Sequence, residues 1–320
     1  MKVLISVDIE GVAGVYHAEQ VRAGNPEYER ARRWMAQEAN AAIDGAFAAG
    51  ATEVLVNDSH GGFRNMPPDL LDARAQVIQG KPRYLSMVAG VELGVDAVCM
   101  VGYHSRAQGR GILAHTINGF AFARVCINGQ PASEAHIYGA LAGAYGVPVV
   151  MLAGDDVLRA ENEALFPQAV FVQTKRATGH ASGISLSPEQ AQAAIREGVV
   201  RALTQRAQCQ PLLAASPVRV EIMATSPGMA DLFCQWPTLE RVDGCTVRFS
   251  APEIESAVRM VNCLSAMSSM LRLANVHTKM YKGASRSRCG VGQRMGICTE
   301  AGTGTAVTLF CGEPSITRSE

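Results

Sequence analysis

The stretch MKVLISVDIEG, residues 1–11, decides the fold class of this chain. Residues 2–7 are mostly apolar and β-branched, which is typical of a strand covered on both faces. Two acidic residues, Asp8 and Glu10, follow this strand directly. The single lysine and short apolar run do not resemble a secretory signal, so we expect a buried first strand.

Residues 1–155 continue as an alternation of strand-like and helix-like stretches. A helix is expected from Asn25-Pro26 to Gly50, because Asn favours the N-cap, Pro the first turn and Gly the stop. The strand-like stretches are residues 52–58, 96–104 and 147–154, and a second helix is expected over 134–145. This alternation predicts an α/β fold with a mostly parallel sheet covered by helices.

The remainder of the chain has a different character. Residues 156–275 predict a smaller α+β domain, with helices at 187–203 and 254–271 and strands at 217–224 and 245–250. Residues 276–320 form an atypical C-terminal tail, whose Gly- and Ser-rich composition is typical of poorly ordered chain ends.

Composition excludes several classes of function. Lys plus Arg and Asp plus Glu number 29 each, and aromatic residues make up 6%, so nucleic acid is not an expected partner. No run of about 18 apolar residues predicts a membrane span. The nine cysteines form no CxxC pair, and a cytoplasmic location is the simplest expectation.

Polar side chains follow the ends of three predicted strands. Asp8 and Glu10 follow the first strand, His60 the second and His104 the third. Ligands of open parallel sheets collect beyond the carboxyl ends of the strands. We therefore expect these four side chains to lie along one edge of the sheet.

Each of these residues also has a purely structural interpretation. Asp8 and Glu10 could cap a helix or pair with an arginine, although two carboxylates so close together repel unless a cation lies between them. His60, in the turn NDSHGG, and His104, in GYHSRA, could be structural histidines. Imidazole and carboxylate ligands together suit zinc and related divalent ions.

Two further candidates lie between the third and fourth predicted strands. His115 is either a buried structural histidine or a catalytic base or nucleophile. Glu134 either complements a helix dipole or supplies a third carboxylate to a metal. The sequence contains no HExxH, GxSxG or GxxxxGK[ST] motif that would identify another enzyme class.

Taken in order, several phrases resemble the D-aminopeptidase family of the bacterial dipeptide-transport operon. The resemblance covers most of residues 1–275, and the order and spacing of the phrases make it specific. The phrases are SVDIEGVAG at 6–14, EVLVNDSHG at 53–61, GYHSRA at 102–107, AHT at 114–116 and VVMLAGDD at 149–156.

The resemblance implies an enzyme that removes N-terminal D-residues from short peptides. It implies His115 as the catalytic residue and a ten-subunit particle of two five-membered rings. Whether His115 or a water molecule is the nucleophile stays open, as does the choice between D- and L-residues. It further implies two zinc ions held by Asp8, Glu10, His60, His104 and Glu134.

The same residues are compatible with two other functions. A dinuclear metal phosphoesterase would use similar ligands together with arginines such as Arg106 and Arg110. A non-catalytic module that binds metal or peptide would have no open coordination position.

Overall fold

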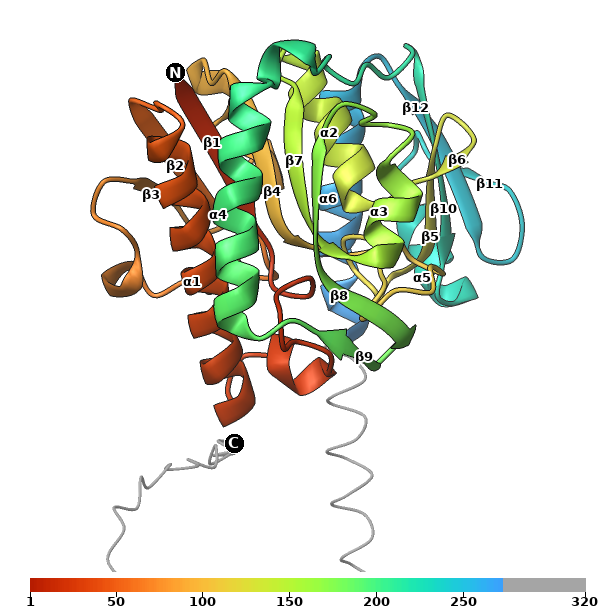
Figure 1. The fold of residues 1–320 in the computed structure, drawn as a ribbon. Coiled ribbons are helices and arrows are strands. Elements are labelled where there is room, and N and C mark those ends of the chain that lie inside the picture. The colour runs from red at the N-terminus through yellow and green to blue at the C-terminus, as the bar shows by residue number, and fades with distance from the viewer. Residues whose placement is uncertain (273–320) are drawn as a thin grey trace, which may run out of the picture. The chain divides into compact units, whose positions relative to one another are not determined.

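Two β-sheets organise residues 1–272, the part of the chain that the computed structural model describes (Figure 1). The larger sheet has seven strands in the order β3-β2-β1-β4-β7-β8-β9. Its strands are β1 Lys2–Val7, β2 Glu53–Asp58, β3 Gln76–Ile78, β4 Ala97–Tyr103, β7 Val149–Asp155, β8 Val170–Gly179 and β9 Ser182–Ser185.

The smaller sheet has five antiparallel strands in the order β11-β12-β10-β5-β6. Strands β5 and β6 come from the sequence between β4 and β7, so the chain passes between the two sheets more than once. The strands are β5 Phe122–Ile127, β6 Gln130–Pro131, β10 Val218–Ala224, β11 Glu240–Arg241 and β12 Thr246–Ala251.

Strand β1 lies at the centre of the larger sheet and is buried on both faces. It pairs in parallel with β2 and β4, so that Val3 faces Val54 on one side and Ala97 on the other. Val3 and its alternate neighbours contribute to one apolar core, while Leu4 contributes to the second core on the opposite face. The predicted buried first strand is confirmed.

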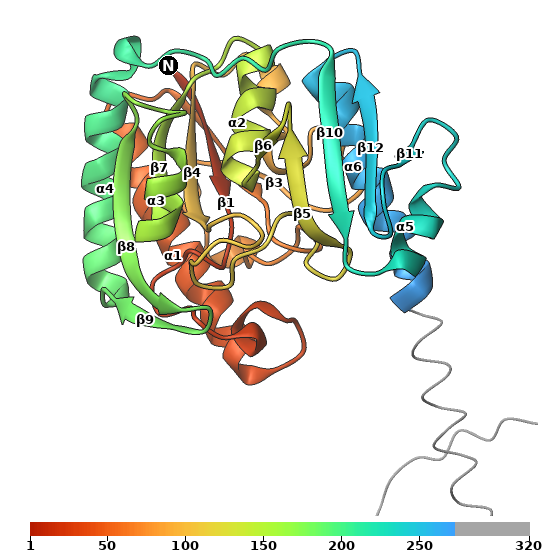
Figure 2. The same ribbon diagram turned by 90° about the vertical axis from the view of Figure 1, so that its right-hand side faces the viewer.

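Helices cover both faces of the larger sheet (Figure 2). Helices α1 and α4 pack against each other on one face, and α2 covers the other face, where α6 lies between α2 and the smaller sheet. The α-helices are α1 Pro26–Ala48, α2 Glu134–Ala144, α3 Asp156–Asn162, α4 Pro188–Thr204, α5 Pro227–Phe233 and α6 Ile254–Met267. The 3₁₀ helices are η1 Ala18–Val21, η2 Pro68–Leu70, η3 Ser86–Val88, η4 Val91–Leu93 and η5 Arg206–Gln208.

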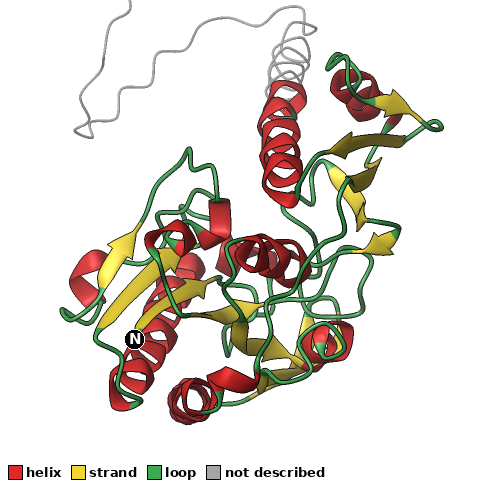
Figure 3. Cartoon of the chain, turned by 90° about the horizontal axis from the view of Figure 1, so that it is seen from above, coloured by secondary structure: helices red, strands yellow, loops and turns green. Residues whose placement is uncertain are grey.

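The fold class expected from the sequence is confirmed. Seven strands form a mostly parallel sheet, with β9 antiparallel at its edge, and the predicted start of α1 is present as an Asn25 N-cap that accepts from the Tyr28 amide. Figure 3 shows the helices packed around the two sheets from above. The domain boundary near residue 155 stays a prediction, and the predicted tail lies outside the described residues. No helix among residues 1–272 has the length and apolar character needed to cross a bilayer.

Candidate metal centre and active site

The carboxyl ends of β1, β2 and β4 bring the predicted site residues together. Asp8 follows β1, His60 lies two residues beyond β2 and His104 directly follows β4. These parallel strands are adjacent in the sheet, so their ends meet at one edge, as expected. Glu10 and two residues from later segments complete what we call the His–carboxylate cluster: Asp8, Glu10, His60, His104, His115 and Glu134.

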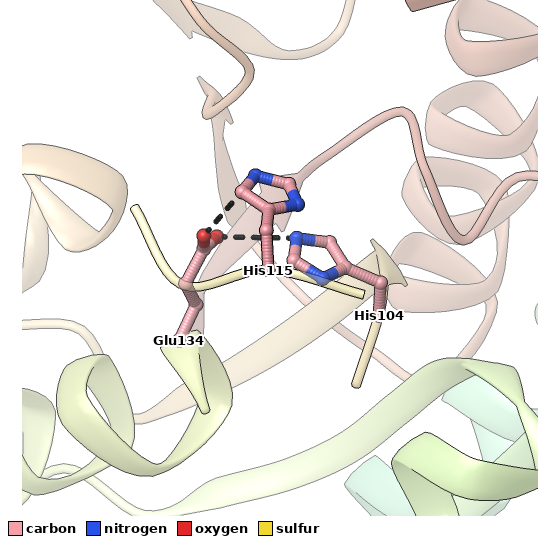
Figure 4. Close-up of side chains that lie close together, drawn as sticks. All are labelled: His104, His115 and Glu134. Carbon is pink, nitrogen blue, oxygen red and sulfur yellow. Dashed lines mark ion pairs between the residues drawn. The ribbon is translucent and has the colours of Figure 1, made fainter. Parts of the chain in front are cut away.

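Local sequence explains how the last members reach the site. Glu134 is the first residue of α2, and the N-cap Ser133 hydroxyl accepts from the His136 amide. The Glu134 Oε1 atom also accepts a hydrogen bond of 2.6 Å from the Ile117 amide. His115 lies in the loop between β4 and β5, beside Glu134. Figure 4 shows Glu134 pointing from α2 toward both His104 and His115.

The Asp8 carboxylate lies between two imidazoles. Its Oδ1 is 3.2 Å from His60 Nδ1, and its Oδ2 is 3.5 Å from His104 Nε2. His60 Nδ1 is also 3.0 Å from Glu10 Oε2, and His104 Nε2 is 3.5 Å from Glu134 Oε2. The Asp8 carboxylate is therefore central. His60 and Glu10 lie on one side of it, and His104 and Glu134 lie on the other.

His115 completes the cluster from the solvent side. Its Nε2 lies 3.7 Å from Glu134 Oε1 and 4.0 Å from Glu10 Oε1. Its side chain is 26% exposed, whereas that of His104 is 1% exposed. His115 is therefore the imidazole of this pair that an incoming molecule can reach.

Backbone carbonyl groups orient all three histidines. His60 Nε2 lies 2.8 Å from Val21 O, His104 Nδ1 lies 2.9 Å from Ser105 O, and His115 Nδ1 lies 2.9 Å from Leu113 O. A carbonyl oxygen only accepts, so each of these ring nitrogens carries the hydrogen. In the neutral ring the other nitrogen then presents a lone pair to the carboxylates, which is the usual arrangement of metal-binding histidines.

The electrostatics of the cluster also favour a cation. Burial lowers the pKa of His60 and of His104, but the neighbouring carboxylates outweigh burial and raise both pKa values well above the usual range. Burial and the nearby Glu10 raise the pKa of Asp8. Three buried carboxylates at such short distances require compensating positive charge, which protons or metal ions can supply.

Two buried atoms of the cluster lack a hydrogen-bond partner among the described residues. They are Glu10 Oε2 and His104 Nε2, and both point into the cluster. Leaving buried polar atoms unpaired is costly, and a bound cation would satisfy both. Two triplets of potential ligands have their donor atoms within 4.8 Å of one another: Asp8, Glu10 and His104, and His104, His115 and Glu134. The residues present therefore fit divalent metal ions.

Glycines allow the segment that carries Asp8 and Glu10 to approach β4 closely. The Gly11 amide donates to Gly102 O at 2.7 Å, and a Cβ atom on Gly11 would lie only 2.0 Å from Tyr103 O. Gly102 has a φ of 70°, and a Cβ atom there would lie 2.2 Å from Asp8 O. Larger residues at either position would displace the carboxylates.

Lys175 supports the same segment, and the sequence did not reveal it. This buried lysine of β8 donates from Nζ to the carbonyl oxygens of Glu10 and Val15, the latter at 2.6 Å. Burial lowers the pKa of Lys175 to about 8. The neighbouring Thr174 hydroxyl donates to Gly11 O at 2.8 Å. The one sequence signal for this role is a lysine in a strand that is otherwise partly buried.

Glu38 of α1 holds the next part of this segment. Its Oε1 accepts a hydrogen bond of 2.8 Å from the Ala13 amide. The side chain is almost fully buried, and burial raises the pKa of Glu38 to about 7.

Other polar residues singled out in the sequence have structural contacts. Arg106 lies against Glu161, with its amide 2.9 Å and its Nε 3.6 Å from that carboxylate. Asp58 accepts from the amides of Asn65 and Met66 and so fixes the turn after β2. Asp155 caps α3. None of these contacts orients a histidine of the cluster.

The cluster opens into a cavity of about 660 Å³. Asp8, His60, His115 and Glu134 line one part of it. Its other walls come from the segment after β2, the segment before η3, the loop before β5, helix α2, and helix α6 with the residues that follow it. They include Phe63, Lys81, Arg83, Ile117, Tyr138, Asn262, Ser265 and Arg272.

Comparisons with known proteins agree with this site. Residues 1–263, which include the whole His–carboxylate cluster, match the peptidase M55 family model, described as D-aminopeptidase. A D-aminopeptidase of Bacillus subtilis (strain 168) is 34% identical over 275 residues, which cover 86% of this chain and 98% of that protein. The solved Zn-dependent D-aminopeptidase DppA from Bacillus subtilis, described as a self-compartmentalizing protease, has a TM-score of 0.81. Its sequence is 32% identical, and the match covers 84% of this chain and 98% of that chain.

Proposed function

Since the chain belongs to the peptidase M55 family of D-aminopeptidases, we propose that it removes N-terminal D-residues from short peptides with two bound zinc ions. The observation that carries this proposal is the Asp8 carboxylate, whose two oxygens face different histidines at 3.2 and 3.5 Å. A carboxylate between two imidazoles is suited to join two metal ions. The solved relative is Zn-dependent, which supports the choice of metal.

The proposed ligands divide around Asp8. Glu10 and His60 lie together on one side, and His104 and Glu134 lie together on the other. Bound zinc would supply Lewis acidity to the scissile carbonyl group and to water at this site. The hydrogen bonds from the histidines to Val21 O and Ser105 O pre-orient the ligand nitrogens.

His115 is the proposed catalytic residue. Its Nε2 faces Glu10 and Glu134, its Nδ1 is held by Leu113 O, and its side chain is accessible from the cavity. In the overall reaction the amide C–N bond breaks, the carbonyl carbon gains a hydroxyl group from water, and the leaving amine gains a proton. His115 either attacks the carbonyl carbon itself or carries the proton from water to the leaving amine.

A paired activity assay tests the proposed function. The zinc-loaded protein is expected to hydrolyse D-Ala-D-Ala much faster than L-Ala-L-Ala and to leave p-nitrophenyl phosphate intact. Hydrolysis of the phosphate ester without peptide hydrolysis would favour the phosphoesterase alternative. Tight binding of D-Ala-D-Ala without turnover would favour a non-catalytic binding module.

We also propose a homodecamer of two five-membered rings in the cytoplasm. The solved relative is described as self-compartmentalizing, which supports an assembly that encloses its active sites. The six cysteines within residues 1–272 are free, a state that a reducing compartment would maintain. Native mass spectrometry would give a mass of ten chains if the assembly is correct.

A further inference from the structure

Lys81 lines the cavity that contains the His–carboxylate cluster. It lies in the segment between β3 and η3 and is exposed, so its side chain belongs to the accessible part of the cavity wall. The Lys81 Nζ atom lies 4.1 Å from the centroid of the Phe63 ring. Because Phe63 is 4% exposed, this contact gives the lysine a firm apolar support.

The Lys81 side chain makes no hydrogen bond within residues 1–272, in contrast to that of its neighbour Arg83. The Arg83 guanidinium lies 4.0 Å from the same Phe63 ring centroid. It donates to Ile78 O at 3.1 Å and to Asp58 O at 2.7 Å, so it serves to hold backbone segments together. Among residues 1–272, no carboxylate pairs with Lys81 Nζ and no acceptor takes a hydrogen bond from it. Within that part of the chain the Lys81 ammonium contacts the Phe63 ring and has no polar partner.

The geometry of a short peptide fits a cation at this position. The scissile bond must lie at the His–carboxylate cluster, so a peptide's C-terminal carboxylate must extend from the cluster into the cavity. Only one residue, roughly 3.5 Å long when extended, separates the scissile carbonyl carbon of a dipeptide from its C-terminal carboxylate carbon. In a dipeptide the C-terminal carboxylate would thus lie a short distance along the cavity from the cluster. Burial and the nearby Arg83 lower the pKa of Lys81, and the Glu134 carboxylate is close enough to oppose this lowering.

We propose that the Lys81 ammonium binds the C-terminal carboxylate of the substrate and so selects short peptides with a free C-terminus. This inference rests on the proposed peptidase function and concerns the substrate class of the same site. A longer peptide, or one with an amidated C-terminus, would leave Lys81 without its charge partner. An ammonium–carboxylate contact at a partly desolvated site strengthens binding about tenfold or more.

The test compares D-Ala-D-Ala with D-Ala-D-Ala amide in the wild type and in Lys81→Met. The wild type is expected to have the higher kcat/KM on the acid, and the variant to lose at least about tenfold of that preference, mainly through KM. Lys81→Arg should keep part of the preference. Lys2→Met is the matched control, because Lys2 pairs with Glu53 at 2.9 Å and lies outside the cavity lining.

Equilibrium binding provides a second readout that does not depend on turnover. Calorimetry with a reduced-peptide-bond analogue of D-Ala-D-Ala should show weaker binding to Lys81→Met than to Lys2→Met by a similar factor. An equal effect of Lys81→Met on acid and amide would overturn the inference. Loss of the preference in Arg272→Met instead would also overturn it, since Arg272 is another cation of the cavity wall. If the wild type cleaved neither peptide, the proposed function itself would fail.

Discussion

The imidazole rings of His104 and His115 stack nearly parallel, with centroids 4.2 Å apart and planes inclined by 11° (Figure 4). One ring is buried and aimed at Asp8 and Glu134, while the other is accessible from the cavity. The stack therefore places a proposed metal ligand and a proposed catalytic group side by side with different exposure. This division of roles leads to different expectations for the two histidines.

His115→Ala is expected to keep bound zinc and to lose turnover. The five proposed ligands stay in place, but the group that attacks the carbonyl or moves the proton is removed. We expect kcat on D-Ala-D-Ala to fall by about 100-fold or more. Stopped-flow or steady-state kinetics measure the loss, and elemental analysis of the same sample measures the zinc. A near-normal kcat in a zinc-loaded variant would exclude His115 from the mechanism.

Asp8→Asn should change the metal stoichiometry itself. An amide of the same shape removes the negative charge between His60 and His104, so it binds two cations poorly. We expect the variant to retain at most one zinc ion per chain after dialysis against buffered zinc. Asp96→Asn is a matched control, because Asp96 accepts a hydrogen bond from the Lys2 amide and is not part of the cluster. Full retention of two ions in Asp8→Asn would argue against a bridging role.

Lys175→Met is expected to weaken the site because it removes the donor that holds the backbone of Glu10. The change leaves the carbonyl oxygens of Glu10 and Val15 without their buried donor, which should cost about 2 kcal/mol of unfolding free energy. Because Glu10 is a proposed ligand, zinc affinity should fall as well, by roughly tenfold. Urea unfolding and zinc competition titrations measure the two effects. Wild-type zinc affinity in a folded Lys175→Met protein would show that this lysine does not position Glu10.

Glu38 should make the stability of the protein depend on pH. Burial raises the pKa of Glu38 in the folded state from 4.5 to about 7, so the folded protein holds a proton that the unfolded chain has released. Stability is then greatest below pH 4.5 for this group and falls as the pH rises to about 7, by about 3 kcal/mol. Unfolding free energies of wild type and Glu38→Gln at pH 5 and 8 should show a smaller pH difference in the variant. An equal difference between pH 5 and pH 8 in the two proteins would contradict the assignment of this pH dependence to Glu38.

The fold was predictable where local signals and topology agree. The buried strand β1 and the Asn25-Pro26 start of α1 follow from short-range sequence patterns, and both are present. The hairpin of β5 and β6 was missed, although its Asn128-Gly129 turn is a strong local hairpin signal. It lies within residues 1–155, the predicted α/β domain, whereas its strands join the smaller sheet.

The site was predictable only in part. The strand-end positions of Asp8, His60 and His104 place them at one edge of the sheet, as the topology requires. The inclusion of His115 and Glu134 depended on the family resemblance, because loop paths cannot be derived from spacing. Lys175 lies 165 positions from Glu10, and no sequence pattern links a strand residue to a carbonyl group so far away. Its role emerges only from the tertiary structure.

The zinc content of active protein is the sharpest test of the proposed dinuclear site. Purified protein that hydrolyses D-Ala-D-Ala should contain two zinc ions per chain by plasma mass spectrometry. Dialysis against a chelator should remove the metal and the activity together, and added zinc should restore both. Full hydrolysis by protein that holds less than one divalent metal ion per chain would rule out the dinuclear zinc mechanism.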